Sequence, residues 1–292
     1  MTDPLRAHIG FSPEDFDAQY NLRAGRPDYE QTVIPAWQDA AKAARDALSC
    51  QLDLRYGPGA KQKLDVFFCG NPQAPVLIYF HGGYWQRGDK SIYSFLAVPF
   101  VAAGVNVVMV GYDLCPDVTI TQISQQARDA VAWLWDHAPD LGLNREWFTI
   151  MGHSAGGHIT QMMMATKWSA QTPDLPDYLI RAGVPISPLS YLEPVRLTAA
   201  LNSGIRMDAA EAEAESPMTQ HPPRTNAPQL VIVGGGETDE FQRQAQMYVD
   251  KFHSAERVVE LCVVPDVDHF DELNVLSDPG SEVFKRALKL IL

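Results

Sequence analysis

The spacing of apolar residues divides the chain into a helical part and a longer part that alternates strands with helices. Ser12 and Pro13 are typical of a helix start, and a second helix is expected over residues 30–48. Residues 51–69 then alternate between apolar and polar around a Gly-Pro-Gly turn, which predicts a β-hairpin. We therefore expect the first 48 residues to form a helical arm laid over a core that begins with strands.

The central and C-terminal parts of the chain alternate continuous apolar runs with helical stripes. A continuous apolar run predicts a strand buried on both faces, as in a parallel sheet. Such runs occupy residues 75–80, 105–110, 147–151, 178–186, 229–233 and 258–264, and helices are expected over about 90–103, from 121, after 158, around 241–252 and over 281–292. The pattern predicts an α/β fold with a mostly parallel sheet and helices on both faces.

Residues 187–228 interrupt this alternation. They lose strand character and carry glutamates among alanines and prolines, which indicates helices and loops. We interpret this segment as a small cap insertion over the strand ends. The whole chain of 292 residues is long enough for one large core and short for two, so we expect residues 1–292 to form a single domain.

Composition narrows the classes of partner. The formal net charge is −13, which disfavours a nucleic-acid or anionic-membrane surface, because either would need a basic patch. The first six residues lack the layout of a signal peptide, and no apolar stretch is long enough for a membrane span. The four cysteines are scattered, which favours reduced thiols. We expect a cytoplasmic protein that acts on a small molecule, as a monomer or a homodimer.

A candidate nucleophile lies where one buried strand meets a helix. Gly152-His153-Ser154-Ala155-Gly156 is a Gly-x-Ser-x-Gly sequence, preceded by an apolar run and followed by a helical one. A sharp strand-to-helix turn needs small residues two positions before and after the serine. By chance the bare pattern occurs in roughly one chain in ten of this length. The assignment of Ser154 therefore depends on partners farther along the chain.

A serine hydroxyl needs an imidazole as its base, and the imidazole needs an orienting acid. Of the eight histidines, His269 follows the last predicted strand, where the carboxyl edge of the sheet would present it. His153 and His158 flank Ser154 too closely to fold back onto it. We predict His269 as the base; the alternative is a solvated loop residue.

The acid is expected after the strand at residues 229–233. Three glycines there allow a sharp turn that would bring Glu237 back over the strand end. Asp239 is the alternative acid, although an acid in the first turn of a helix also complements the helix dipole.

The negative oxygen of an acyl-transfer intermediate needs preorganised N–H donors. The loop at His81 follows a strand, and its glycine pair allows close backbone approach. We predict Gly82, Gly83 and Ala155 as donors, with Tyr84 as a further candidate.

Together these segments resemble one known family. The motifs are His-Gly-Gly-Tyr-Trp-Gln at 81–86, Gly-His-Ser-Ala-Gly-Gly-His at 152–158, Glu-x-x-x-Phe-x-Arg-Gln at 237–244, and Gln-Tyr-Asn at 19–21. They are similar to the arylformamidase (kynurenine formamidase) branch of the His-Gly-Gly esterases and lipases, over most of the chain. The resemblance implies an α/β-hydrolase fold and selects Glu237, where the family often carries aspartate. It also implies hydrolysis of an N-formyl aryl amide or a small ester, without metal or cofactor.

The substrate is less defined than the chemistry. Tyr84 and Trp85 beside the predicted oxyanion loop would suit an aryl group, and the cap offers Tyr191 or Met207, although these residues could equally pack the cap against the body. A broad-specificity carboxylesterase is the second reading, since it would use the same three catalytic residues. A catalytically inactive binding protein is a third, and it would require one of the three to be missing.

Overall fold

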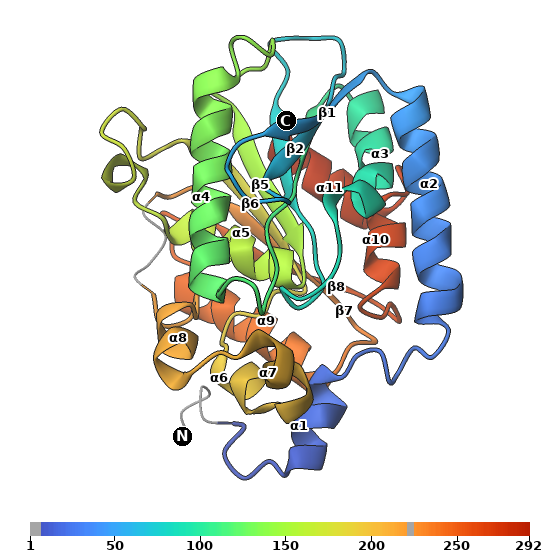
Figure 1. The fold of residues 1–292 in the computed structure, drawn as a ribbon, viewed down its shortest axis with the longest axis vertical. Helices are drawn as coiled ribbons and strands as arrows, with labels where there is room; N and C mark the ends of the chain where they lie inside the picture. Colours follow the sequence, from blue (N-terminus) through green and yellow to red (C-terminus); the bar gives the residue numbers. More distant parts are fainter. Residues whose placement is uncertain (1–6, 221–224) are drawn as a thin grey trace.

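The computed structural model describes residues 7–220 and 225–292, so the first six residues and residues 221–224 of the predicted cap segment fall outside it. Its centre is an eight-stranded sheet in the order β1-β2-β4-β3-β5-β6-β7-β8 (Figure 1). The strands are β1 (Cys50–Arg55), β2 (Lys63–Phe67), β3 (Val76–Phe80), β4 (Asn106–Val110), β5 (Phe148–His153), β6 (Ile180–Ile186), β7 (Gln229–Gly234) and β8 (Val259–Val264). The β1–β2 hairpin and the β2–β4 pair are antiparallel, and the other neighbours are parallel, which confirms the predicted sheet.

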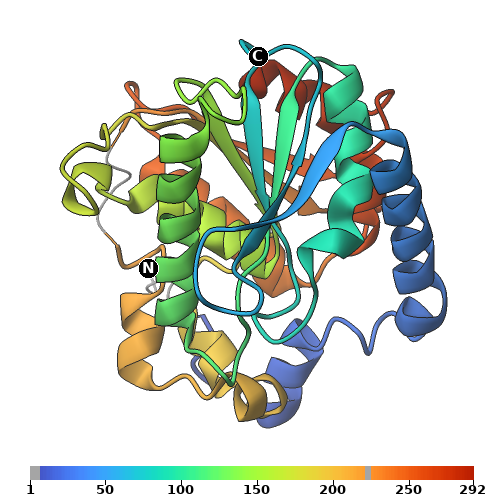
Figure 2. The same ribbon diagram turned by 45° about the horizontal axis from the view of Figure 1, so that its top comes forward.

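Helices cover both faces of the sheet, as Figures 1 and 2 show. On one face lie α2 (Ile34–Ala47), α3 (Ala97–Ala102), α10 (Asp271–Leu276) and α11 (Glu282–Ile291); on the other lie α4 (Ile120–His137), α5 (Ala155–Ala165) and α9 (Asp239–Phe252). Within β3, Leu77 and Tyr79 pack on the face that α2, α3, α10 and α11 cover. Ile78 and Phe80 pack on the opposite face. Successive strand residues point to opposite faces, so burial on both faces explains the continuous apolar runs.

The N-terminal arm reaches the sheet at two places. The helix α1 (Pro13–Tyr20) begins with the predicted cap, in which Ser12 and Asp15 exchange side-chain and backbone hydrogen bonds. It contacts α9 and the cap helices α6 (Glu193–Leu197) and α7 (Ala199–Ile205). The chain then enters a π-helical turn over Tyr29–Val33 and continues directly into α2 on the sheet face. The arm therefore connects the end of the sheet with one of its faces.

In its described part, the segment predicted as a cap contains three short helices. These are α6, α7 and α8 (Ala209–Ala214), and they lie with α1 at the end of the molecule where the parallel strands finish (Figure 1). In the described part of the chain, no helix has the length and apolar character needed to cross a membrane.

Two helices differ from the sequence prediction. The helix expected over residues 90–103 consists of a 3₁₀ segment, Lys90–Leu96, followed by the short α3. Pro99 explains the division, because it has no N–H to donate and is tolerated only in the first turn of an α-helix. The helix α10 was not predicted. It starts at Asp271, two residues after His269, and the Asp268 carboxylate accepts the N–H groups of Phe270 and Asp271, both at 2.9 Å.

Candidate active site

Ser154 lies on a strained turn between β5 and α5. Its φ is 58° and its ψ is −117°, and its N–H donates to the carbonyl oxygen of Ile186 at 2.8 Å. A β-carbon at Gly152 would lie 2.2 Å from the carbonyl oxygen of Gly156, and one at Gly156 would lie 2.0 Å from that of Phe80. No real side chain tolerates such distances. The two glycines are therefore required by close backbone packing, as the motif predicts.

Ser154 opens into a cavity of about 170 Å³ at the carboxyl ends of the strands. Its walls come from the N-terminal arm, the His81 loop, the turn that carries Ser154, the cap and the His269 loop. The lining residues are Tyr20, Asn21, Leu22, Arg23, Tyr29, Trp37, Gly83, Tyr84, Gln86, Arg87, Tyr93, His153, Ser154, Ala200, Leu201, His269 and Phe270. The cavity is below the range of roughly 300–1,000 Å³ that is usual for drug-sized ligands, so it suits a small substrate.

His269 and Glu237 form a buried pair beside this cavity. The distance from His269 Nδ1 to Glu237 Oε2 is 2.6 Å, and an ionised carboxylate can only accept, so the imidazole N–H donates. Asp239, the alternative acid, is exposed in the first turn of α9. Within the described residues no hydrogen bond joins Ser154 Oγ to His269, although both line the cavity. Such contacts often tighten only when substrate binds.

The chain turns sharply before Glu237, as predicted, since the Glu237 N–H donates to the Gly234 carbonyl oxygen at 3.2 Å. None of Gly234, Gly235 and Gly236 has a positive φ, so no left-handed turn requires them. A β-carbon at Gly234 would instead lie 2.2 Å from the carbonyl oxygen of Val267. These glycines make room for the loop that carries His269, and the close approach of the two loops brings acid and base together.

The loop after β3 presents unpaired N–H groups beside Ser154. A β-carbon at Gly82 would lie 3.2 Å from that of Ser154, and Gly83 has a φ of 121° that favours glycine. Within the described residues, the N–H groups of Gly82, Gly83 and Ala155 donate to no protein acceptor. Ala155 is also the first residue of α5, where the helix dipole favours negative charge.

His81 and Tyr112 hold this loop from behind. The Tyr112 hydroxyl donates to the His81 carbonyl oxygen at 2.6 Å, and the two rings stack with centroids 4.3 Å apart. Burial lowers the pKa of His81 to about 4, so its imidazole is neutral near pH 7. A neutral ring adds no charge next to the candidate oxyanion donors.

The two predicted aromatic walls separate in the structure. Tyr84 lines the cavity and donates its hydroxyl to the Tyr20 carbonyl oxygen at 2.7 Å, which ties this loop to the arm. Trp85 does not line the cavity, which corrects the prediction. It is fully buried, with its ring edge-on to His158 at 5.1 Å. Both residues have positive φ, at 50° and 55°, and the backbone turns Trp85 into the core.

The cap contributes residues other than those expected. Tyr191 and Met207 do not line the cavity, and Met207 is buried in the apolar cluster beneath the cap. Ala200 and Leu201 of α7 line it instead. The amide of Gln86 donates to the Leu201 carbonyl oxygen at 3.1 Å, so the cap is anchored to the His81 loop.

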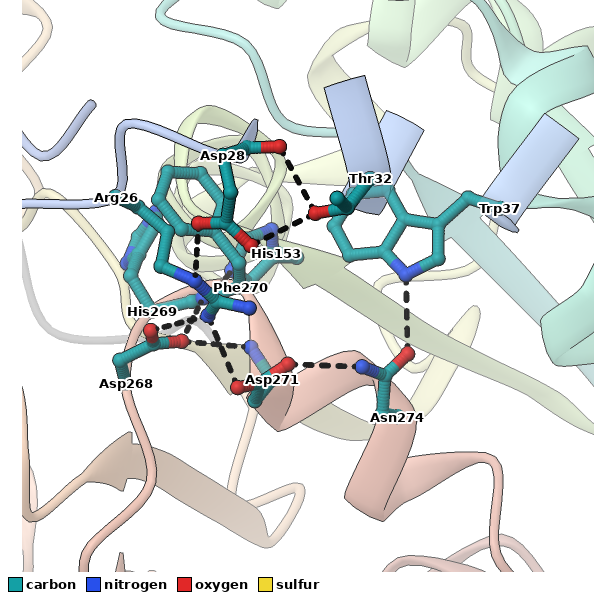
Figure 3. A network of polar contacts seen from close by, with 10 residues as sticks. All are labelled: Arg26, Asp28, Thr32, Trp37, His153, Asp268, His269, Phe270, Asp271 and Asn274. Carbon is teal, nitrogen blue, oxygen red and sulfur yellow. Dashed lines mark hydrogen bonds and ion pairs between the residues drawn. The ribbon is translucent and has the colours of Figure 1, made fainter. Parts of the chain in front are cut away.

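Most of the arm side of the site was not predicted from the sequence. Arg26 lies between carboxylates of the arm and of the His269 loop, as Figure 3 shows. It pairs with Asp28 at 3.0 Å, with Asp271 at 2.9 Å and with Asp268. The hydrogen bond to Asp268 is the main reason why the pKa of Arg26 is raised, with Asp271 adding to it. The resemblance at residues 19–21 was the available signal that the arm reaches the site.

One group of described side chains has the spacing of a metal site. Ligand atoms of His153, His269 and Glu272 lie within 4.8 Å of one another. However, His153 Nε2 is 2.8 Å from the His269 carbonyl oxygen, and His269 Nδ1 is occupied by Glu237. Two of the three residues are therefore already held by protein hydrogen bonds, so these side chains do not fit a preformed metal site.

Comparison with known proteins gives the family. The family model described as alpha/beta hydrolase fold matches residues 77–270, which run from β3 past His269. The chain belongs to the α/β-hydrolase family. Within it, the chain is arylformamidase-like: it is 31% identical to a kynurenine formamidase of Salmo salar, covering 96% of this chain and 94% of that one. For the Danio rerio kynurenine formamidase, the identity is 30%, with 96% and 97% covered.

Other relatives are esterases. An ethyl acetate hydrolase of Pseudomonas putida is 28% identical over 66% of this chain and 65% of its own length. A solved structure from Silicibacter sp. TM1040, provisionally named as a thioesterase, is 33% identical with a TM-score of 0.78, covering 97% of this chain and 99% of that one. This α/β-hydrolase is thus an enzyme of a family that acts on small substrates.

Proposed function

We propose that this hydrolase cleaves small aryl formamides of the N-formylkynurenine type through an acyl-serine intermediate on Ser154. One observation carries the proposal. A strained serine opens into the same cavity as a buried His269–Glu237 pair and borders a loop of unpaired N–H groups. This is the arrangement that acyl transfer needs: a nucleophile, an oriented base and donors for the oxyanion.

The reaction would proceed in two halves. Ser154 Oγ attacks the formyl carbon while His269 takes the hydroxyl proton, and the negative oxygen accepts hydrogen bonds from Gly82, Gly83 and Ala155 N–H. The C–N bond then breaks, and His269 returns the proton to the leaving aryl amine. Water next attacks the formyl-serine, with His269 again as base, and formate leaves as Ser154 regains its proton. Glu237 stabilises the transient imidazolium.

The walls of the cavity support an aryl leaving group. Six of its lining residues are aromatic: Tyr20, Tyr29, Trp37, Tyr84, Tyr93 and Phe270. Aromatic walls favour stacking with an aryl ring, and the small volume favours a substrate of one ring with a short acyl group. Relatives that cover almost the whole chain, arm included, are named kynurenine formamidases, which supports the same substrate class.

The test is a comparison of kcat/KM for N-formylkynurenine and p-nitrophenyl acetate on the same preparation. We expect the formamide to be the better substrate. Formamide turnover about a thousand-fold weaker than ester turnover would overturn the proposal. Ser154→Ala is the control and should abolish both activities at an unchanged melting temperature, because an alanine fits this turn. Near-normal activity of that variant would remove the serine mechanism itself.

A broad carboxylesterase is the second candidate, and the similarity to an ethyl acetate hydrolase favours it. It would use the same serine chemistry on short acyl esters, so only the ratio of the two kcat/KM values separates the candidates. An inactive binding protein is a third reading. A fluorophosphonate probe should label Ser154, and a failure to label it would support that reading.

A further inference from the structure

A second buried carboxyl lies behind the Glu237–His269 pair. Glu272 of α10 is fully buried, and its Oε2 is 2.6 Å from the hydroxyl oxygen of Ser187. The same hydroxyl is also hydrogen-bonded to Glu237 Oε1. Ser187 follows β6 directly, and its φ of 42° is in the left-handed region that a non-glycine residue rarely adopts. The strained backbone thus places one hydroxyl between two acids.

The number of protons fixes the charge of these acids. A serine hydroxyl has one proton, so it can donate to only one of two carboxyl groups. The other contact is favourable only if that carboxyl carries a proton and donates to Ser187 Oγ. Two ionised carboxylates around a single hydroxyl would repel each other and leave one oxygen without a donor. The geometry therefore requires one neutral acid in the pair.

Glu272 is the acid that carries the proton. Glu237 has donors for an anion, since its Oε1 accepts the Gly234 N–H at 3.1 Å and its Oε2 accepts from His269. Glu272 Oε1 has no hydrogen-bond partner among the described residues. Burial, and then the charge of Glu237, raise the pKa of Glu272 well above its ordinary value.

Within the described residues, no ion pair joins Glu272 to a lysine or an arginine of the elements packed around it. The titratable groups there are Glu237 after β7, His269 before α10, His153 at the end of β5 and Tyr79 of β3. His153 Nε2 lies 3.7 Å from Glu272 Oε2 but hydrogen-bonds to the His269 carbonyl oxygen, and burial lowers its pKa well below the ordinary value. Burial likewise raises the pKa of Tyr79, so both neighbours are neutral.

We propose that Glu272 is a neutral carboxylic acid that holds Glu237 in position through Ser187. The ordered chain is Glu272 Oε2–H to Ser187 Oγ, Ser187 O–H to Glu237 Oε1, and His269 Nδ1–H to Glu237 Oε2. A glutamate has one more rotatable bond than the aspartate that often occupies this place, so fixing its second oxygen keeps the first against His269. Glu272 is a positioning residue, and this role rests on the proposed serine hydrolase function.

Kinetics of matched variants test the positioning. Glu272→Ala and Ser187→Ala should each lower kcat about tenfold with little change in KM, as expected for loss of one buried hydrogen bond. Because both break the same chain, the double variant should be no worse than either single one. Glu272→Gln should rescue kcat to within about threefold, since a neutral amide can still donate to Ser187. Glu282→Gln is the control, because this side chain is exposed at the start of α11.

The pH profile separates a neutral from an ionised Glu272. For Glu272→Gln, the lower limb of the kcat/KM profile should coincide with that of the wild type, because no charge is lost. A shift of that limb to lower pH by about one unit would show that a negative charge next to His269 had been removed, and would overturn the proposal. Unchanged kcat in Glu272→Ala would also overturn it. Melting temperatures show which variants remain folded.

Infrared spectroscopy tests the proton without any substrate. The wild type near pH 7 should show the C=O stretching band of a protonated carboxyl group, and Glu272→Gln should lose it. Absence of that band in the wild type would overturn the assignment even if the enzyme turned over neither test substrate. The kinetic arm uses p-nitrophenyl acetate as well, so failure on the formamide alone would count against the proposed substrate and not against Glu272.

Discussion

The cavity has two sides that are built in different ways. On the sheet side, Ser154 and the His81 loop extend from the ends of β5 and β3, and β5 is hydrogen-bonded to a parallel neighbour on each side. On the arm side, the wall from Tyr20 to Trp37 is joined to the body mainly by side chains. These contacts include the Arg26 ion pairs and a 3.0 Å hydrogen bond from Trp37 Nε1 to Asn274 (Figure 3).

This difference indicates that the two sides of the cavity have different roles. A non-glycine residue at positive φ, such as Ser154, persists only where the surrounding structure strongly constrains it, and the sheet provides that constraint. Ion pairs that are partly exposed contribute little free energy and are easily altered. Substitutions on the sheet side should therefore abolish the chemistry, whereas substitutions on the arm side should only modulate it.

The largest effect is expected at the candidate acid. Glu237→Gln keeps the shape of the side chain but removes the charge that accepts from His269 Nδ1, so kcat/KM should fall by about 10⁴-fold. Asp239→Asn is the matched control, because this carboxylate is exposed on α9, and its effect should stay within about twofold. Steady-state kinetics on p-nitrophenyl acetate measure both. The reverse order would move the acid to Asp239.

The same contrast explains how far the sequence could predict the site. In a parallel sheet the carboxyl ends of the strands meet at one edge, so chain order alone brought Ser154, Glu237 and His269 into one expected cluster. The positions of these three side chains depend on local backbone geometry, which short sequence motifs describe well. The arm side depends on how a separate segment docks, and no pattern in residues 20–37 encodes Arg26 as the partner of a loop 242 residues away.

Two features of the site could not be predicted from the sequence, each for a specific physical reason. The direction of Trp85 depends on consecutive positive φ angles, which neither composition nor periodicity indicates. Glu272 follows Asp271 and resembles an ordinary acid in the first turn of a helix, so its burial could not be read from charge pattern. Ser187 had a usable signal: it follows a strand of the parallel sheet at the carboxyl edge, where side chains reach the site.

One added methyl group should destabilise the fold on the sheet side of the cavity much more than on the arm side. In Gly156→Ala, the new β-carbon would lie 2.0 Å from the Phe80 carbonyl oxygen, so the turn that carries Ser154 must shift, at a cost of about 3 kcal/mol or more. In Gly25→Ala, on the arm, the nearest atom is the Leu22 carbonyl oxygen at 3.5 Å, an ordinary contact. That change should stay within about 0.5 kcal/mol. Urea unfolding measures both, and equal losses would contradict the contrast.

Acid should weaken the sheet side through its buried histidines. Burial lowers the pKa of His81 and of His158 to about 4, below the ordinary 6.5. Between these values the unfolded chain binds protons that the folded chain does not. Stability is therefore fully present above pH 6.5 and falls as the pH drops towards 4, by at most about 3 kcal/mol for each histidine.

His158→Gln tests the share of one histidine in this acid sensitivity. The loss of unfolding free energy between pH 7 and pH 4 should be smaller than in the wild type by up to about 3 kcal/mol. His137→Gln, at the exposed end of α4, is the control and should leave the loss unchanged. Urea unfolding at both pH values gives the comparison. If His158→Gln retained the full wild-type loss, the buried neutral histidine would not be its source.

The smallest effect is expected where the arm meets the His269 loop. Arg26→Ala removes the ion pairs to Asp268 and Asp271, which flank His269 and Phe270, so kcat/KM should fall about tenfold while the fold persists. Lys42→Ala is the control, because it breaks an exposed ion pair with Asp46 on α2, away from the cavity. Added salt should lower wild-type activity towards that of Arg26→Ala, because these pairs are partly exposed and screened. A loss as large as that of Glu237→Gln would mean that the arm belongs to the chemistry itself, and unchanged kinetics would mean that Arg26 does not hold the loop.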